Sequence, residues 1–202
     1  MSLDKRARIA KEAARLLYYG LADEYYTAKR EAAKSVGART LPTNREIAEE
    51  LDRLSDLLEG QEKRENLKKM RKEAYRLMKV LERFSPVLVG SVWRGTARRG
   101  SDIDIRVYSE DEKAVIEALN QSECRIIRRE RKTKTVDADK KSYLHVFVQT
   151  PQGYEAEIVI RSPEDADVKE RCEIFGDELK GLKLKELEEI IQNDPLRKFI
   201  PP

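Results

Sequence analysis

The sequence predicts an α+β fold in which a small mixed sheet, with helices on one face and a candidate site on the other, follows a helical region. Three observations support this prediction. Apolar residues recur at helical spacing through the first 84 residues. Short apolar or alternating segments, typical of strands, then follow between residues 86 and 161. After Ser162-Pro163, the remaining residues have a mainly helical pattern.

The helical region is predicted to span residues 1–84. Its first apolar run extends from Ile9 to Ala28, before the breakers Gly37 and Pro42. Thr43 and Glu46 have the spacing of a capping box and predict the start of a second helix. The expected buried stripe of that helix is Ile47, Leu51, Leu54 and Leu58. A third helix is expected after Gly60, and residues 85–202 are expected to form a separate domain with C-terminal helices.

Strands are predicted from Val87 to Val89 and over four further segments. The segment 102–108 alternates polar and apolar residues, as a half-buried strand does. Ser109 and Glu112 have capping-box spacing, which predicts a short helix through about Leu119. The other predicted strands are 124–130, 143–149 and 154–161.

Composition limits the class of protein but selects no partner. The chain has 202 residues, with 41 basic and 38 acidic side chains, so its net charge is only +3. The longest apolar run is too short for a membrane span of about 18 residues, and the N-terminus lacks the apolar segment of a signal peptide. Two distant cysteines, Cys124 and Cys172, fit a reducing compartment. We therefore expect a cytoplasmic protein with no membrane partner.

Two aspartates form the first candidate site. In a strand containing Asp102 and Asp104, alternation puts both carboxylates on one face and Ile103 and Ile105 in the core. Neighbouring carboxylates repel each other, so the arrangement is costly unless a cation lies between them. Carboxylate oxygens suit magnesium. The pair therefore predicts a site for Mg²⁺, with Mn²⁺ as a substitute.

A third acid is expected from a neighbouring strand. Glu155 and Glu157 share one face of the segment 154–161, opposite an apolar face. Glu157 is preferred because apolar or β-branched residues follow it, as in a central strand. Glu155 lies closer to the turn and is the alternative third ligand.

A glycine and a serine follow the first predicted strand. If a helix begins at Gly90-Ser91, its free backbone N–H groups would bind an anion, and glycine lets a phosphate approach the backbone. The segment from Gly90 to Ile105 resembles the hallmark of the DNA polymerase β-like nucleotidyltransferase superfamily. It is similar to minimal nucleotidyltransferases and to archaeal-type CCA-adding enzymes, which share a threonine at the position of Thr96. The residues that carry the resemblance are Gly90, Ser91, Arg94, Gly95, Ser101, Asp102 and Asp104, with Glu157 as the third acid.

This resemblance implies transfer of a nucleoside monophosphate from an NTP, such as ATP, to an acceptor hydroxyl, with release of pyrophosphate. It implies that Asp102, Asp104 and Glu157 are catalytic and bind two Mg²⁺ ions. It also implies that Gly90, Ser91, Arg94 and Ser101 bind the nucleotide, and that residues 85–202 are the catalytic domain. The alternative is a module on the same fold that binds NTP or RNA without chemistry.

The acceptor remains open between an RNA end, a protein side chain and a small molecule, and no oligomeric state is predicted. The basic stretch 125–141 is either a surface for an RNA backbone or a charged edge that protects the sheet. His145 is the only histidine, which excludes zinc sites built from several histidines. It either faces the site or is a packed or solvated residue of the sheet.

Overall fold

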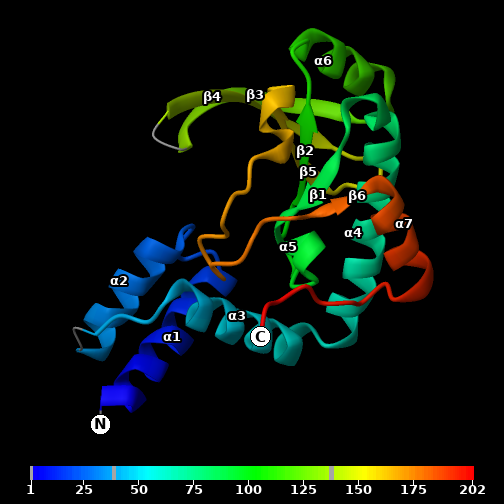
Figure 1. The fold of residues 1–202 in the computed structure, drawn as a ribbon. Helices are drawn as coiled ribbons and strands as arrows, with labels where there is room; N and C mark the ends of the chain where they lie inside the picture. The colour runs from blue at the N-terminus through cyan, green and yellow to red at the C-terminus, as the bar shows by residue number, and fades with distance from the viewer. Residues whose placement is uncertain (1, 38–39, 137–138) are drawn as a thin grey trace. The chain divides into compact units, whose positions relative to one another are not determined.

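The computed structural model describes residues 2–37, 40–136 and 139–202 (Figure 1). The helices are α1 (Ser2–Tyr18), α2 (Tyr25–Val36), α3 (Asn44–Glu59), α4 (Gln61–Val80), α5 (Gly90–Arg94), α6 (Glu112–Gln121) and α7 (Leu184–Asn193), with 3₁₀ turns η1 (Glu82–Phe84) and η2 (Pro163–Asp167). The strands are β1 (Val87–Val89), β2 (Ile103–Tyr108), β3 (Arg125–Val136), β4 (Asp139–Gln149), β5 (Glu155–Arg161) and β6 (Leu182–Lys183).

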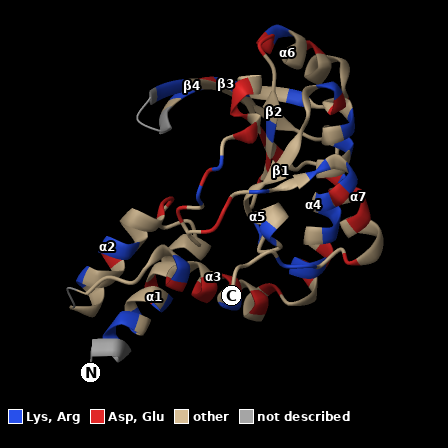
Figure 2. Cartoon of the chain, in the orientation of Figure 1, with Lys and Arg blue, Asp and Glu red and all other residues tan. Residues whose placement is uncertain are grey.

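The chain folds into two compact units. The helical unit comprises residues 1–63, 171–178 and 201–202, and the sheet unit comprises residues 64–170 and 179–200. Basic and acidic residues alternate along the chain in both units (Figure 2). The predicted domain boundary at residue 84 leaves α4 with the helical region, whereas the apolar residues of α4, such as Met70 and Leu77, pack in the core of the sheet unit. No helix among the described residues is long and apolar enough to cross a membrane.

The core of the helical unit is built mainly from small residues. Ala13 on α1 and Ala28 and Ala32 on α2 are fully buried, and Ile9 and Ile47 complete the contact between α1, α2 and α3. The continuous helix expected through Ala28 is wrong, because α1 ends at Tyr18. Gly20 adopts a positive φ of 66°, which α-helical backbone does not allow, so the chain turns before α2 begins.

Helix α3 begins with the predicted capping box, in which the Thr43 side chain accepts from the Glu46 backbone N–H. Its buried stripe differs from the expectation, since Leu58 is 49% exposed. The buried position is taken instead by Ser55, whose Oγ lies 2.6 Å from Lys63 Nζ. The same ammonium group lies 2.6 Å from Asp52 Oδ1 and 2.8 Å from Asp56 Oδ1. A buried lysine needs such partners, so α3 turns a polar face towards the start of α4.

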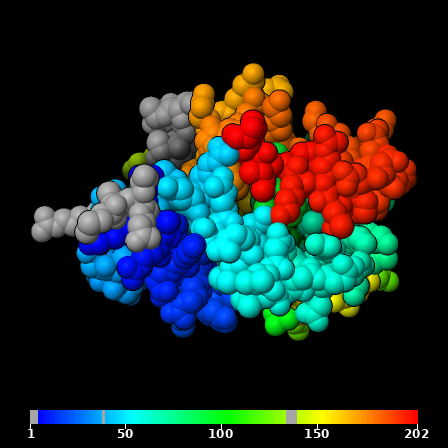
Figure 3. Space-filling view, turned by 90° about the horizontal axis from the view of Figure 1, so that it is seen from below, coloured from blue at the N-terminus to red at the C-terminus, as the bar shows by residue number. Residues whose placement is uncertain are grey.

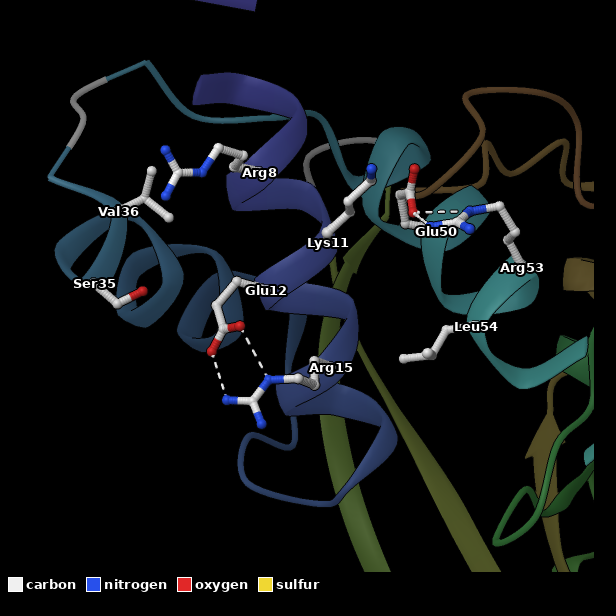
Figure 4. Close-up of a pocket in the computed structure, with 9 residues that line it drawn as sticks. All are labelled: Arg8, Lys11, Glu12, Arg15, Ser35, Val36, Glu50, Arg53 and Leu54. Atoms are coloured by element: carbon white, nitrogen blue, oxygen red, sulfur yellow. Dashed lines mark hydrogen bonds and ion pairs between the residues drawn. The ribbon is translucent and has the colours of Figure 1, made fainter. Parts of the chain in front are cut away.

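A groove of about 560 Å³ lies on the helical unit (Figure 4). Residues of α1 lie between the end of α2 and one side of α3 in this view. Its lining comprises Arg8, Lys11, Glu12, Arg15, Ser35, Val36, Glu50, Arg53 and Leu54. Glu12 pairs with Arg15 and Glu50 with Arg53, at 2.9 and 2.6 Å. The groove contains none of the predicted site residues.

The sheet unit has one mixed sheet of six strands in the order β3-β4-β5-β2-β1-β6. Strands β2 and β5 are parallel, and the other neighbouring pairs are antiparallel. Ile103 and Ile105 of β2 lie beside Ala156 and Ile158 of β5, and all four are buried on the same face. Helices α4, α6 and α7 cover this face, with Met78, Leu119 and Leu187 in its core (Figure 1). The predicted α+β fold is confirmed.

Two local predictions in the sheet unit are wrong. The N-cap of α6 is Asp111, whose carboxylate accepts from the Ala114 backbone N–H, and not Ser109. The segment expected to be mainly helical after residue 162 contains a helix only at α7, after the short turn η2. Gly181 has a φ of 68°, and a Cβ there would lie 2.6 Å from the Leu88 carbonyl oxygen. This close approach brings the chain onto the edge of β1 as β6 instead of continuing a helix.

A buried arginine joins α4 to α5 and to the C-terminal segment. The guanidinium of Arg71 donates to the carbonyl oxygens of Val92 and Trp93, at 3.1 and 3.0 Å. It also donates to those of Pro195 and Arg197, at 2.9 and 2.8 Å. Burial lowers the pKa of Arg71 to about 10, so the side chain stays charged at neutral pH. One side chain thereby satisfies carbonyl groups at the end of α5 and in the C-terminal segment.

The C-terminal segment packs across the end of α5. The Phe199 backbone N–H donates to the Arg94 carbonyl oxygen at 3.0 Å, and the Phe199 ring stacks on Trp93 with centroids 6.4 Å apart. A Cβ at Gly95 would lie 2.7 Å from the Arg197 carbonyl oxygen, so only glycine fits beneath the segment. The last residues, in red, are visible on the surface in Figure 3.

Replacing Arg71 should therefore destabilise the protein. Arg71→Met removes the charged donor and leaves four carbonyl groups without it, so we expect a loss of roughly 3–5 kcal/mol in the free energy of unfolding. Urea denaturation measures this loss. Lys69→Ala on the same helix removes an exposed charge and should change the value by less than about 0.5 kcal/mol. Equal effects of the two variants would contradict the role given to Arg71.

Candidate active site

Parallel pairing of β2 and β5 brings the predicted acids together. Asp104 is the register partner of Glu157 in this pairing. Ile103 and Ile105 point to the helix-covered face, so Asp104 lies on the opposite face. Asp102 precedes β2 by one residue and belongs to the same face by alternation. The open face of the sheet therefore carries a group of carboxylates at the start of two central strands.

These carboxylates perturb one another. Burial raises the pKa of Asp104 well above its usual value, and the charges of Asp102 and Glu157 raise it further. Burial is also the main cause of the raised pKa of Asp102, to which Glu157 and then Glu155 add by repulsion. The ionised forms are thus disfavoured in the protein alone, and a bound cation would relieve this repulsion.

The side chain of Glu157 already has two partners from the β3–β4 hairpin. Its Oε1 lies 2.7 Å from Nδ1 of His145 and 3.3 Å from Nζ of Lys132. Glu157 is 18% exposed, whereas Glu155 is exposed at the end of β5, opposite Gln149. Of the two positions considered for His145, the structure shows the one facing the site, because its ring lies on the same face as the acids.

The site face continues beyond Asp104 to a separate group of charges. Arg106 of β2 and Arg161 of β5 both contact the carboxylate of Glu170, Arg106 at 3.3 Å. Glu170 and Arg161 are buried, at 9% and 6% exposure. Arg106 lowers the pKa of Asp104 only as a minor opposing effect. Arg106 and Arg161 are thus paired with Glu170 and form a group separate from Asp102, Asp104 and Glu157.

Gly90 lies directly against the acids. It is the first residue of α5 and has a φ of 70°, which favours glycine. A Cβ at this position would be 1.8 Å from Asp104 Oδ2, well inside any allowed contact. The missing side chain therefore lets the Asp104 carboxylate touch the backbone at the Gly90-Ser91 turn. Ser91 follows at a half-buried position.

The sequence also matches a family model described as a nucleotidyltransferase domain, over residues 67–193. This range is more than half of the chain. The chain belongs to the nucleotidyltransferase domain family. The predicted membership of the polymerase β-like superfamily is thereby confirmed, and the matched range contains all the predicted site residues.

A solved structure described as a cytoplasmic RNA terminal U-transferase is similar to part of this chain. The two are 21% identical, with a TM-score of 0.34. The similarity covers 48% of this chain and 29% of that chain, so the chain spans less than a third of the transferase. No curated protein matches the sequence.

Two of the predicted nucleotide-binding residues, Arg94 and Ser101, make contacts within the domain itself. The guanidinium of Arg94 lies 4.1 Å from the Trp93 ring centroid and donates to the Phe199 carbonyl oxygen at 2.7 Å, and Arg94 is 4% exposed. The Ser101 hydroxyl accepts from the Arg98 backbone N–H at 3.0 Å, within the turn before β2. Gly90 is the predicted nucleotide-binding residue that touches an acid. The roles of Arg94 and Ser101 towards a nucleotide stay predictions.

The donor set of the nucleotidyltransferase site fits a hard cation. Carboxylate oxygens are the ligands that magnesium prefers, and burial, with added repulsion from the neighbouring acids, raises the pKa values of Asp102 and Asp104. Among the described residues, no three His, Cys, Asp or Glu side chains are gathered closely enough to hold a metal ion. Glu157 is instead bound to His145 and Lys132.

The sequence predicted neither the contact of Lys132 with Glu157 nor that of His145 with Glu157, although it left open that His145 faces the site. Lys132 appeared only as one member of a basic stretch, although its ammonium reaches Glu157 across β4. The link between His145 and Glu157 requires the register of β4 against β5, which pairs His145 with Val159 and Phe147 with Glu157. Alternation alone could place these residues on one face, but it could not show which strands are neighbours.

Gly90 should tolerate alanine less well than another glycine with the same backbone conformation. Gly100 has a φ of 78° and open space around it, so Gly100→Ala should cost only backbone strain, about 1–2 kcal/mol. Gly90→Ala adds the collision with Asp104 and should cost more, measured by urea denaturation. In an Asp104→Ala background, where only the Cβ of residue 104 remains at 3.0 Å, most of the extra cost at Gly90 should disappear. A cost that does not depend on Asp104 would contradict the contact.

Proposed function

We propose that this nucleotidyltransferase transfers a nucleoside monophosphate from an NTP to an acceptor hydroxyl and releases pyrophosphate. The observation that carries the proposal is the contact between the Asp104 carboxylate and the backbone at Gly90, with Glu157 on the neighbouring strand. A phosphate group at the Gly90-Ser91 turn would lie next to the acids that hold the cations. Membership of the nucleotidyltransferase domain family supports nucleotide transfer in general, and we propose the roles of individual residues from the geometry of the site.

In the proposed step, the acceptor oxygen bonds to the α-phosphorus as its hydroxyl proton leaves. The bond from this phosphorus to the oxygen that bridges the α- and β-phosphates breaks, and pyrophosphate departs. Gly90 and Ser91 bind the β- and γ-phosphates through backbone N–H groups and the serine hydroxyl. Glu157 is the group assigned to accept the proton, directly or through water.

Asp102 and Asp104 would hold two Mg²⁺ ions, with Glu157 as a ligand of one of them; Mn²⁺ would serve in their place. Such ions lower the pKa of an acceptor hydroxyl and neutralise charge on a leaving pyrophosphate. The chain's own contribution is the placement of three acids on one rigid face, because β2 and β5 fix their spacing. His145 and Lys132 orient the third acid through their contacts with its Oε1.

The contacts of Glu157 also favour one alternative function. A carboxylate bound to His145 and Lys132 has fewer free oxygen lone pairs for a cation. A domain that kept Glu157 in this state would bind NTP or RNA without transferring a nucleotide. Release of pyrophosphate from NTPs by the purified protein with candidate acceptors, and its loss in Asp104→Asn, distinguishes the two, because a binding module releases none.

The metal assignment predicts a thermal shift. With Mg²⁺ and a non-hydrolysable NTP at about 100 times its Kd, the melting temperature should rise by roughly 5–10 °C through binding linkage. Asp104→Asn should abolish this rise. Without metal, the variant should melt at an equal or higher temperature, because it removes a carboxylate whose ionised form is disfavoured. An undiminished rise in Asp104→Asn would refute the site.

The third acid is tested by a matched pair of substitutions on one strand. Glu157→Gln should lower turnover at least about 100-fold, because it removes a metal ligand and proton acceptor. Glu155→Gln makes the same chemical change two residues away and should cost far less. Pyrophosphate release at saturating NTP gives both values. The reverse ranking would assign the third ligand to Glu155.

A further inference from the structure

The order of strands places the parts of the proposed site in one line across the sheet. Gly90 and Ser91 follow β1, and Asp102 and Asp104 belong to β2. Next comes β5 with Glu157, then β4 and finally β3 at the edge. The proposed phosphate site and the β3–β4 hairpin therefore lie on opposite sides of the three acids.

This order has a consequence for the acceptor, which rests on the proposed function. In phosphoryl transfer the attacking oxygen and the leaving oxygen lie roughly in line on opposite sides of phosphorus. If pyrophosphate leaves on the β1 side, the acceptor approaches from the side of β4 and β3. The surface chemistry of the hairpin should then match the acceptor.

A β-bulge decides which hairpin side chains face the site. Ile126 pairs with Val148 on the core face, and regular alternation would put Arg128 on that face too. The register shifts between Ile126 and Arg128, so Arg128 pairs with Phe147 instead. Phe147 is also the neighbour of Glu157 on β5, so Arg128 shares the open face with the acids. Bulges of this kind re-aim side chains next to active sites.

The site-facing side of the hairpin combines cations with an aromatic ring. The Arg128 guanidinium lies 3.8 Å from the Phe147 ring centroid, and Lys132 Nζ lies 5.3 Å from it. Arg128 and Lys132 keep 56% and 51% of their side-chain surface exposed. Glu130, in contact with both, offsets part of their charge. A planar guanidinium stacked on a ring, with its outer face exposed, can stack on a nucleobase.

We propose that the acceptor is the end of a single-stranded nucleic acid, whose terminal bases stack on the platform formed by Arg128 and Phe147 beside Glu157. Lys132, already bound to Glu157, lies where a backbone phosphate would follow the stacked base. RNA and DNA share this chemistry, and the two are separate arms of the test. A small apolar acceptor would instead need an enclosed pocket, whereas this side of the hairpin is an exposed, charged surface.

The opposite face of the hairpin supplies a matched control. Arg129 pairs with Val146, which is fully buried in the core, so Arg129 belongs to the helix-covered face. Arg131 lies on that face too and pairs with Glu112 of α6 at 2.8 Å. The basic stretch 125–141 could serve either an RNA backbone or the protection of the sheet edge; residues 137–138 lie outside the described residues, and the cations at 128–132 are divided between two faces. Arg128→Ala and Arg129→Ala make the same charge change on adjacent residues that face opposite ways.

The experiment measures binding of fluorescein-labelled single strands of about ten nucleotides, as RNA and as DNA, to the full chain by fluorescence anisotropy at low salt. Arg128→Ala should weaken binding at least about fivefold, which corresponds to loss of one stacked base. Phe147→Leu keeps an apolar side chain but removes the ring and should have a similar effect. Arg129→Ala should change the Kd less than about twofold. Melting temperatures confirm that each variant is folded.

Three results of the binding experiment would overturn the inference: no binding of either strand at low salt, equal weakening by Arg128→Ala and Arg129→Ala, or no effect of Phe147→Leu. Binding of RNA alone, DNA alone or both supports it and identifies the strand. Failure of the proposed function looks different. If strands bind through Arg128 but no NTP yields pyrophosphate, the surface stands and the enzyme assignment falls. If nucleotide transfer goes to a protein or small molecule, the enzyme stands and the acceptor assignment falls.

Discussion

The parallel register between β2 and β5 is the constraint on which the sheet unit depends. It aligns Ile103 and Ile105 with Ala156 and Ile158 on the helix-covered face, and Asp104 with Glu157 on the other. Because side chains alternate, a slip of one residue would bury the acids and expose the isoleucines. The hydrophobic core therefore fixes the spacing of the acids. The geometry of the candidate site is a by-product of packing that the fold needs anyway.

The acids remain electrostatically unfavourable within this rigid frame. Burial raises the pKa values of Asp102 and Asp104, and repulsion between the neighbouring acids raises them further. Neighbouring elements adapt to them on both sides. On one side, the absence of a side chain at Gly90 leaves room for the Asp104 carboxylate. On the other side, His145 and Lys132 bind Glu157. Such repulsion at a site is typical of groups reserved for a ligand of opposite charge.

Much of this arrangement could be predicted from local patterns. Alternation in residues 102–108 and 154–161 was sufficient to put the acids opposite the apolar residues, and the Thr43–Glu46 spacing correctly gave the start of α3. Features that depend on exceptions to periodicity were missed. Gly20 interrupts an apolar pattern that continues beyond it, and the bulge after Ile126 reverses the face on which Arg128 lies. Neither exception leaves a signal in spacing.

Arg71 illustrates a second kind of limit. In the sequence, Arg71 is one of many basic residues in a predicted helix. In the structure, it donates hydrogen bonds to four carbonyl groups that are distant in the sequence. Two belong to residues 21 and 22 positions away, and two to residues 124 and 126 positions away. Backbone groups carry no sequence signature, so only the folded chain could show this contact.

The long reach of Arg71 also sets an order of assembly. During synthesis, α4 and α5 leave the ribosome well before residues 195–199. Until those residues arrive, Arg71 has only two of its four carbonyl partners, and the surface of Trp93 and Gly95 lies uncovered. Contacts between distant residues form late because loop closure costs entropy. The contacts of Trp93, Arg94 and Gly95 at the end of α5 are therefore completed only when residues 195–199 pack against them.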